Sequence, residues 1–174
     1  MKSKEHAGPD DSRQLDYSAG LGGAAIGARL RRLSDRIDRD AARVYAALGV
    51  QFEQRWMGVL SLLAERGAMA VGELAESLRI SHPSVSQTRR SLIGAGIIAE
   101  QADPRDARRR TLHLTPEGVA LVARLRPAWA ALELAGEVLN REAGNTVLAL
   151  NRLELALDGL SLERRVEIIL KGEG

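Results

Sequence analysis

The chain has 174 residues, of which 45% are hydrophobic and 28% charged, and its net charge at pH 7 is only +2. It contains no cysteine, which excludes disulfides, zinc–thiolate sites and thiol redox sensors. No stretch reaches the roughly 18 apolar residues of a membrane span, and the polar, Gly-, Asp- and Ser-rich start does not resemble a secretory signal. We therefore expect a cytoplasmic protein.

Two segments precede the middle of the chain. Residues 1–20 predict a disordered tail, with Gly20 to Gly23 as its hinge. In residues 21–50, apolar side chains recur at steps of three and four between charged residues, which predicts an amphipathic helix. They are Ile26, Leu30, Leu33, Ile37, Ala41, Val44 and Leu48. From the pattern alone, this stripe fits either an intramolecular core or pairing with a second copy.

Residues 51–115 predict three short helices and a hairpin. Phe52, Trp56, Val59, Leu60 and Leu63 would share one side of the first helix, and Leu74, Ala75 and Leu78 belong to the second. The third helix begins near His82, because Ser81 can cap it and Pro83 needs no amide partner there. Gly94 and Gly96 end this helix, and Gly96 is the better candidate for a left-handed cap.

The third helix has a polar face. Val85, Leu92 and Ile93 would face a core, and hydroxyl, amide and guanidinium groups would point outward. Such groups suit the major groove, where Gln pairs with adenine and Arg with guanine. The expected DNA-contacting residues of this helix are Ser81, His82, Ser84, Ser86, Gln87, Thr88, Arg89 and Arg90.

A small hairpin follows. Residues 97–99 and 111–114 are β-prone, and residues 103–106 (DPRD) supply turn chemistry between them. The hairpin residues expected at DNA are Arg105, Asp106, Arg108, Arg109 and Arg110. Residues 79–110 contain seven arginines and three acids, a net charge of +4, so the rest of the chain sums to −2. Positive charge is thus concentrated on the helix and hairpin.

Residues 116–174 predict further helices. Thr115 and Pro116 begin one, which has an apolar stripe, and Ser161 caps a last one through Leu170. The stripe comprises Val122, Leu125, Trp129, Leu132 and Leu139, and a leucine-rich helix with Leu148, Leu150, Leu153, Leu155 and Leu157 follows it. Apolar stripes at both ends of the chain favour a homodimer. A two-fold dimer would read a pseudo-palindrome with half-sites roughly 10 bp apart.

Residues 56–121 resemble the winged helix-turn-helix core of the MarR family of transcriptional regulators. The most diagnostic pieces are ELAESL at residues 73–78, VSQ at 85–87, GAGII at 94–98 and DPRDAR…LHLTPEG at 103–118. The resemblance implies a mostly α fold with a small β-hairpin wing (α+β), a winged core flanked by N- and C-terminal dimerisation helices. Ala70 departs from the family's usual Ser or Thr cap.

The same resemblance implies how the protein works. In the family, the wing acid and the arginine two positions later form a pair, here Asp106 and Arg108, and wing arginine reaches the minor groove. Because Ala107 replaces a basic residue, Arg105 and Arg109 are alternatives for part of that contact. Family members respond to a small-molecule effector, often an aromatic acid, which binds between the dimer helices and the winged core.

Other interpretations have weaker sequence support. The arginine run alone also fits a solvated, salt-bridged turn, and the alternative function is a winged-helix protein-interaction module without specific DNA binding. The residues offer no nucleophile elbow, no spaced metal ligands around His6, His82 and His113, and no cofactor fingerprint. We therefore expect neither an enzyme nor a bound cofactor. Tyr45, Phe52, Trp56 and Trp129 could line an effector pocket, but their spacing is more typical of core.

Overall fold

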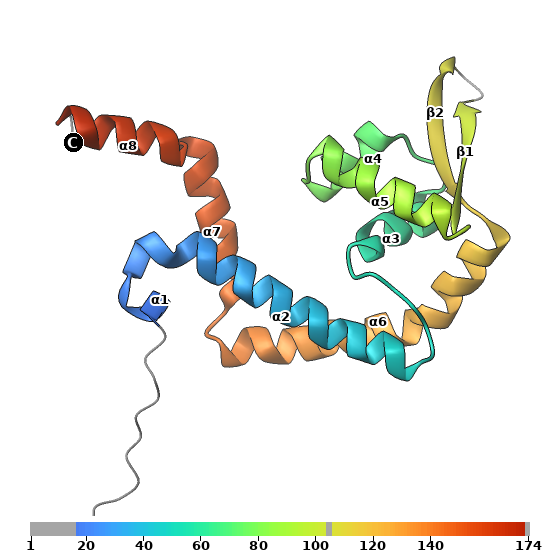
Figure 1. Ribbon diagram of the computed structural model, residues 1–174, viewed down its shortest axis with the longest axis horizontal. Helices are drawn as coiled ribbons and strands as arrows, with labels where there is room; N and C mark the ends of the chain where they lie inside the picture. Colours follow the sequence, from blue (N-terminus) through green and yellow to red (C-terminus); the bar gives the residue numbers. More distant parts are fainter. Residues whose placement is uncertain (1–16, 104–105, 173–174) are drawn as a thin grey trace, which may run out of the picture. The chain divides into compact units, whose positions relative to one another are not determined.

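The computed structural model describes residues 17–103 and 106–172 (Figure 1). The chain divides into two compact units, residues 1–57 and 58–174, which are treated separately. The first contains a helical turn α1 (Tyr17–Gly20), a 3-10 turn η1 (Gly22–Ala25) and the long helix α2 (Ile26–Ala47).

The junction before α2 differs from the prediction. Residues 17–20, predicted as the end of a disordered tail, are helical, and the predicted glycine hinge is the 3-10 turn. Gly22 adopts a φ of +54°, which lets the chain reverse, Ala25 is buried, and Arg32 donates a hydrogen bond of 3.1 Å to Ser18 Oγ. Residues 1–16 of the predicted tail lie outside the described residues.

The predicted stripe of α2 is present but largely uncovered. Ala41 is buried, whereas the other six members are each at least 38% exposed. The core of this unit lies instead around Tyr45, Phe52 and Trp56. The Tyr45 and Phe52 rings are 4.5 Å apart, the Phe52 and Trp56 rings meet edge to face at 5.6 Å, and Tyr45 donates to Gln54 Oε1 at 2.7 Å.

The second unit has the predicted order of helices and hairpin. Helix α3 (Trp56–Arg66) enters it from the first unit, and α4 (Val71–Leu78), α5 (His82–Gly94), β1 (Ile98–Asp103), β2 (Asp106–Leu114) and α6 (Pro116–Glu142) follow. Its core contains Val59, Leu60, Leu63, Leu74, Val85, Leu92, Ile98, Leu112, Val122 and Leu125, all at most 4% exposed. The expected fold class, mostly α with a small hairpin wing, is confirmed.

The antiparallel hairpin is fixed to the helices at its base. Ile98 pairs with Leu114 and Gln101 with Thr111, and the register shifts between Ala102 and Asp103. Met69, just before α4, exchanges two backbone hydrogen bonds with Leu112, of 3.0 and 2.8 Å. The base of β2 is therefore tied to the chain entering α4.

The last helices are α7 (Thr146–Gly159) and α8 (Leu162–Lys171). As predicted, Ser161 caps α8, since its Oγ accepts the Arg164 amide at 3.2 Å. None of the α7 or α8 residues is buried. Leu155 and Ile169, for example, are about 70% exposed, so these helices retain apolar surface with no cover in the described chain.

Candidate nucleic-acid interface

Local signals define the start and end of α5. The Ser81 hydroxyl accepts the Ser84 amide at 3.3 Å and lies 2.9 Å from the Ser84 hydroxyl, and Pro83 occupies the first turn. Gly96 has a φ of +73°, the left-handed conformation expected after the helix end. Both predicted ends of this helix are confirmed.

The outward face of α5 is polar. Ser81, His82, Ser84, Gln87 and Arg90 are exposed, and Ser86 is half-buried. Five hydrogen-bonding side chains therefore stand at the first three turns of a helix whose opposite side is fixed in the core. Such a face can present donors and acceptors to base edges without moving the backbone.

Two positions of α5 differ from the prediction. Thr88, expected outward, is only 3% exposed, because it lies three residues after Val85 and four before Leu92 on the buried stripe. Ile93, expected in the core, is 37% exposed, because it falls outside that stripe. Thr88 is therefore removed from the candidate contacts with DNA.

Arg89 is held within the protein. Its Nη2 forms an ion pair with Glu100 of β1, and both side chains are less than one-third exposed. Its Nε is buried and has no hydrogen-bond partner among the described residues. The guanidinium thus links α5 to β1, the first strand of the hairpin.

The structure describes only some of the arginines predicted on the hairpin. Asp103 pairs with Asp106 across the turn, as expected, while Pro104 and Arg105 lie outside the described residues, as do the side chains of Asp106 and Arg108. Arg110 is exposed. Arg109 instead reaches α4, where it pairs with Glu73, and its Nε lies 3.8 Å from Asp103 Oδ2.

Glu73 has two roles at the start of α4. Its Oε2 accepts the Ala70 amide at 2.8 Å, which supplies half of a capping box although Ala70 has no capping side chain. That hydrogen bond first, and then Arg109, holds the pKa of the Glu73 carboxyl below its ordinary value. The start of α4, where Ala70 takes the place of the usual Ser or Thr cap, is therefore supported from within the helix.

Arg79 was not among the predicted contact residues. It ends α4 with a φ of 50°, a left-handed conformation that non-glycine residues rarely adopt, and its side chain is exposed in the turn before α5. On the other side of this turn, a Cβ on Gly72 would lie 3.4 Å from His82 Cε1, so the His82 ring rests against α4. Sequence patterns do not indicate that an arginine adopts the left-handed conformation, so only the charge of Arg79 could have suggested a contact with DNA.

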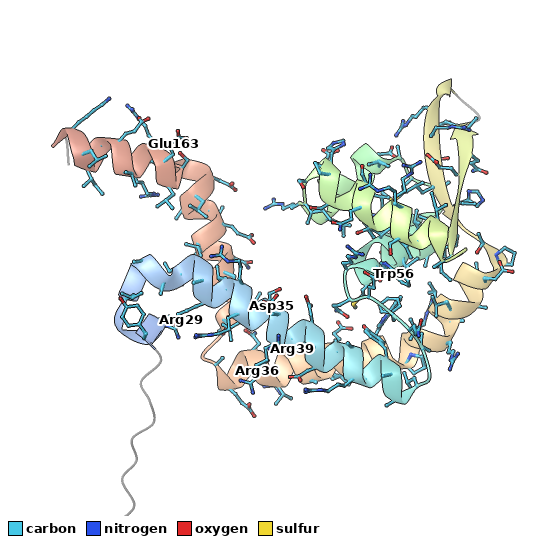
Figure 2. All side chains as sticks on the ribbon, in the orientation of Figure 1. Arg29, Asp35, Arg36, Arg39, Trp56 and Glu163 are labelled. Carbon is cyan, nitrogen blue, oxygen red and sulfur yellow. The ribbon has the colours of Figure 1, made fainter. Side chains whose placement is uncertain are left out.

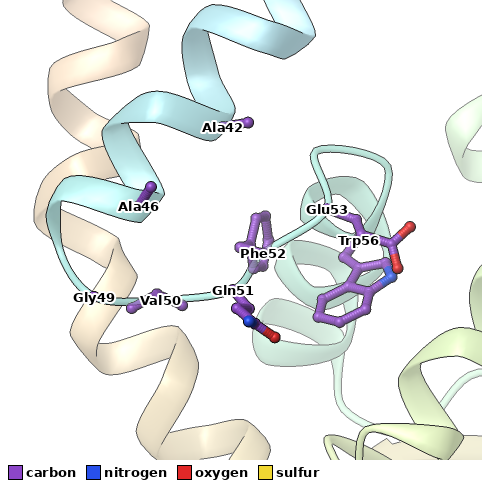
Figure 3. A pocket seen from close by; sticks show the side chains of 8 residues that line it. All are labelled: Ala42, Ala46, Gly49, Val50, Gln51, Phe52, Glu53 and Trp56. Carbon is purple, nitrogen blue, oxygen red and sulfur yellow. The ribbon is translucent and has the colours of Figure 1, made fainter.

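The first unit has a pocket of about 560 Å³ (Figure 3). Ala42 and Ala46 of α2 line one side, the connection to α3 contributes Phe52 and Glu53, and α3 contributes its first residue, Trp56. Phe52 and Trp56 are themselves at most 8% exposed. Of the four aromatic residues considered for an effector pocket, Phe52 and Trp56 therefore both belong to the core and line this pocket. Tyr45 and Trp129 are buried but do not line it.

Residues 17–103 and 106–172 lack two further kinds of feature. No group of three or more His, Cys, Asp or Glu side chains in these ranges is arranged to hold a metal ion. No helix in the same ranges is long and apolar enough to cross a membrane.

Comparison with known proteins identifies the family. The MarR family model matches residues 48–109. An HTH-type transcriptional regulator of Mycobacterium tuberculosis is 33% identical over 104 residues, which cover 58% of this chain and 71% of that protein. The chain belongs to the MarR family. An HTH-type regulator of Mycobacterium bovis gives the same identity and coverage.

Solved structures of similar fold agree with this assignment. The transcriptional repressor CouR bound to a 23-mer DNA duplex is 26% identical, with a TM-score of 0.58 over 75% of this chain and 92% of CouR. BpsR of Bordetella bronchiseptica, whose DNA binding is regulated by 6-hydroxynicotinic acid, is 23% identical with a TM-score of 0.61, over 74% and 92% of the two chains. At this sequence identity, the similarity to BpsR shows a shared fold and no more.

Proposed function

We propose that this MarR-family protein is a sequence-specific, double-stranded DNA-binding transcriptional regulator that acts in the cytoplasm without catalysing a reaction. The observation that supports it most is the polar face of α5, with its capped start, exposed Gln87 and Arg90, and buried opposite side. Base choice would come from Gln87, Arg90, His82 and the exposed hydroxyls of Ser81 and Ser84. CouR, with the same fold, binds a DNA duplex.

Phosphate contacts would supply most of the affinity. Arg79 and Arg110 are exposed on either side of α5 in the sequence, and Arg105 and Arg108 complete the basic wing predicted from the family. Arginine–phosphate contacts release counterions, so binding should weaken steeply as salt rises. Asp106 would orient Arg108, and bound protein would repress or otherwise alter transcription.

We further propose that the functional unit is a homodimer. The exposed apolar stripe of α2 and the uncovered leucines of α7 and α8 are surfaces that a second copy would bury. Figure 2 shows Arg29, Arg36 and Arg39 along α2. Charged residues that flank an apolar stripe can set the register in which two helices pair. The dimer would place two α5 helices on half-sites roughly 10 bp apart.

We also propose that the pocket in Figure 3 binds a small-molecule effector. Its walls are mostly apolar, with Gln51 and Glu53 as polar groups that could orient a ligand. BpsR, of similar fold, responds to 6-hydroxynicotinic acid. A Trp129→Phe variant leaves Trp56 as the sole tryptophan, so quenching of its fluorescence by that acid or related ring compounds would report occupancy of this pocket.

The test of DNA binding is an anisotropy titration against the duplex upstream of the protein's own gene and a scrambled duplex of equal length, at two salt concentrations. We expect tighter binding to the upstream duplex, two protomers per site and a steep salt dependence. Absence of binding to either duplex at low salt, with capture of a protein partner instead, would favour the interaction-module alternative.

A further inference from the structure

Two ion pairs join the hairpin to the helices, and both involve arginines expected to touch DNA. Arg89 of α5 pairs with Glu100 of β1, and Arg109 of β2 pairs with Glu73 of α4. One pair links β1 to α5 and the other links β2 to α4, so together they connect both strands of the wing to the helix-turn-helix formed by α4 and α5. The backbone bridge between Met69 and Leu112 lies at the base of the same hairpin.

We propose that Glu100 and Glu73 are positioning residues, which hold the wing against the helix-turn-helix by ion pairs with Arg89 and Arg109 and keep these two arginines from contacting DNA. This inference rests on the proposed function, since its purpose is to set where the wing meets the duplex. Base reading on α5 then falls to its other exposed polar side chains, among them Gln87 and Arg90.

The first ion pair, between Arg89 and Glu100, holds both side chains in place. Arg89 and Glu100 are 30% and 28% exposed, and the Arg89 Nε is buried, so the side chain is enclosed by protein rather than extended into solvent. A partly desolvated, hydrogen-bonded pair is stronger than a surface pair and restricts the rotamers of both partners. For Arg89 to reach a base, this pair would have to break and leave Glu100 without its cation.

The second pair includes a helix cap. Glu73 is fixed by the Ala70 amide at 2.8 Å before it meets Arg109, so the carboxylate is preorganised on the first turn of α4. Asp103, 14% exposed, lies 3.8 Å from Arg109 Nε on the opposite strand. Arg109 therefore lies between two carboxylates. Their negative charges offset the charge of the guanidinium and weaken its attraction to a DNA phosphate.

Isosteric variants separate this role from direct contact with DNA. Glu100→Gln and Glu73→Gln keep shape and hydrogen-bonding capacity but remove the ion pair, and Glu76→Gln is the matched control because it removes the same charge from an exposed position of α4. None of Glu76's atoms forms an ion pair within the described residues. Circular dichroism verifies that each variant is folded.

The first readout needs no DNA. Hydrogen exchange of the hairpin amides, for example those of Gln101 and Ala102, should be faster in Glu100→Gln and Glu73→Gln than in wild type and in Glu76→Gln. Equal exchange in all four proteins would overturn the proposal. This measurement remains decisive even if the protein selects no DNA, a result that would refute the proposed function alone.

The second readout is selectivity between the upstream and scrambled duplexes. Relative to Glu76→Gln, Glu100→Gln should lose about tenfold in selectivity, while the released Arg89 steepens the salt dependence on scrambled DNA by about 0.9 in log–log slope. The charge reversal Arg89→Glu with Glu100→Arg should regain the selectivity that Arg89→Glu alone loses. If the double variant stays as weak as Arg89→Glu, Arg89 reads DNA directly and the proposal is wrong.

Discussion

Gly118 offers the sharpest test of how the winged core is assembled. It lies in the first turn of α6, where Thr115 caps the helix by accepting the Gly118 amide at 3.0 Å. The Thr115 hydroxyl also donates to Gly96 O at 2.7 Å, and its amide donates to Ile97 O at 3.1 Å. The end of α5, the start of β1 and the start of α6 therefore meet at this glycine.

A Cβ at position 118 has no room. It would lie 2.1 Å from Ile97 O, whereas real Cβ contacts are essentially never below 3.0 Å, so α6 or the strand would have to shift by about 1 Å. The carbonyl cannot turn away without losing its hydrogen bond from the Thr115 amide. Overpacking costs about 1–3 kcal/mol, and a clash with a hydrogen-bonded backbone carbonyl, which cannot rotate away as a side chain can, belongs at the upper end of that range.

We expect Gly118→Ala to lower the free energy of unfolding by about 2 kcal/mol, after the helix propensity that alanine gains is subtracted. For a chain of this length, that corresponds to a fall in Tm of roughly 4–8 °C. Gly136→Ala is the control, because a Cβ there meets nothing within 4 Å, and it should raise stability by about 0.5–1 kcal/mol. The assay is thermal and urea unfolding at one fixed protein concentration, since a dimer's Tm depends on concentration. Equal stability of the two variants would refute the packing argument.

Four further outcomes are expected. Gln87→Ala should cost about 1–3 kcal/mol of binding at the preferred duplex only, and Arg108→Ala should weaken binding to all duplexes alike, as measured by anisotropy; equal losses for both would contradict this division. Because the pKa of Glu73 is lowered by folding, its stabilisation is complete above the ordinary value of 4.5 and is lost as pH falls through the lowered pKa. Wild type should therefore lose more Tm than Glu73→Gln between pH 7 and pH 3, and parallel pH curves would exclude this. Ile37→Asp, on the exposed stripe of α2, should shift the protein toward monomer in sedimentation velocity, and an unchanged dimer would place the interface elsewhere.

Much of the fold was predictable because its signals are local. Ser81 and Pro83 define the start of α5, Gly96 provides the left-handed residue after its end, and Thr115 and Ser161 cap later helices. Each feature depends on residues within one turn of the chain. The same holds for the predicted reversal between Asp103 and Asp106, which pair in the hairpin, because aspartate and proline favour a turn.

The side chains of the site were less predictable, because their partners are distant in sequence. Nothing local indicates that Arg89 pairs with Glu100, or that Glu73 meets Arg109 on another element. Thr88 was misplaced because it is polar although its helical position is buried, and periodicity assigns faces only approximately. Composition located the basic region, whereas only the three-dimensional arrangement distinguishes paired arginines from exposed ones.

The central claim, sequence-selective reading of duplex DNA by α5, is tested most directly by selecting bound sequences from a random duplex pool with purified protein, which requires no knowledge of the operator. We expect enrichment of a two-fold symmetric motif with half-sites roughly 10 bp apart, and a relaxed motif when the same selection is made with Gln87→Ala. Recovery of no motif above the unselected pool, or of the same motif with Gln87→Ala and Arg90→Ala, would contradict the account.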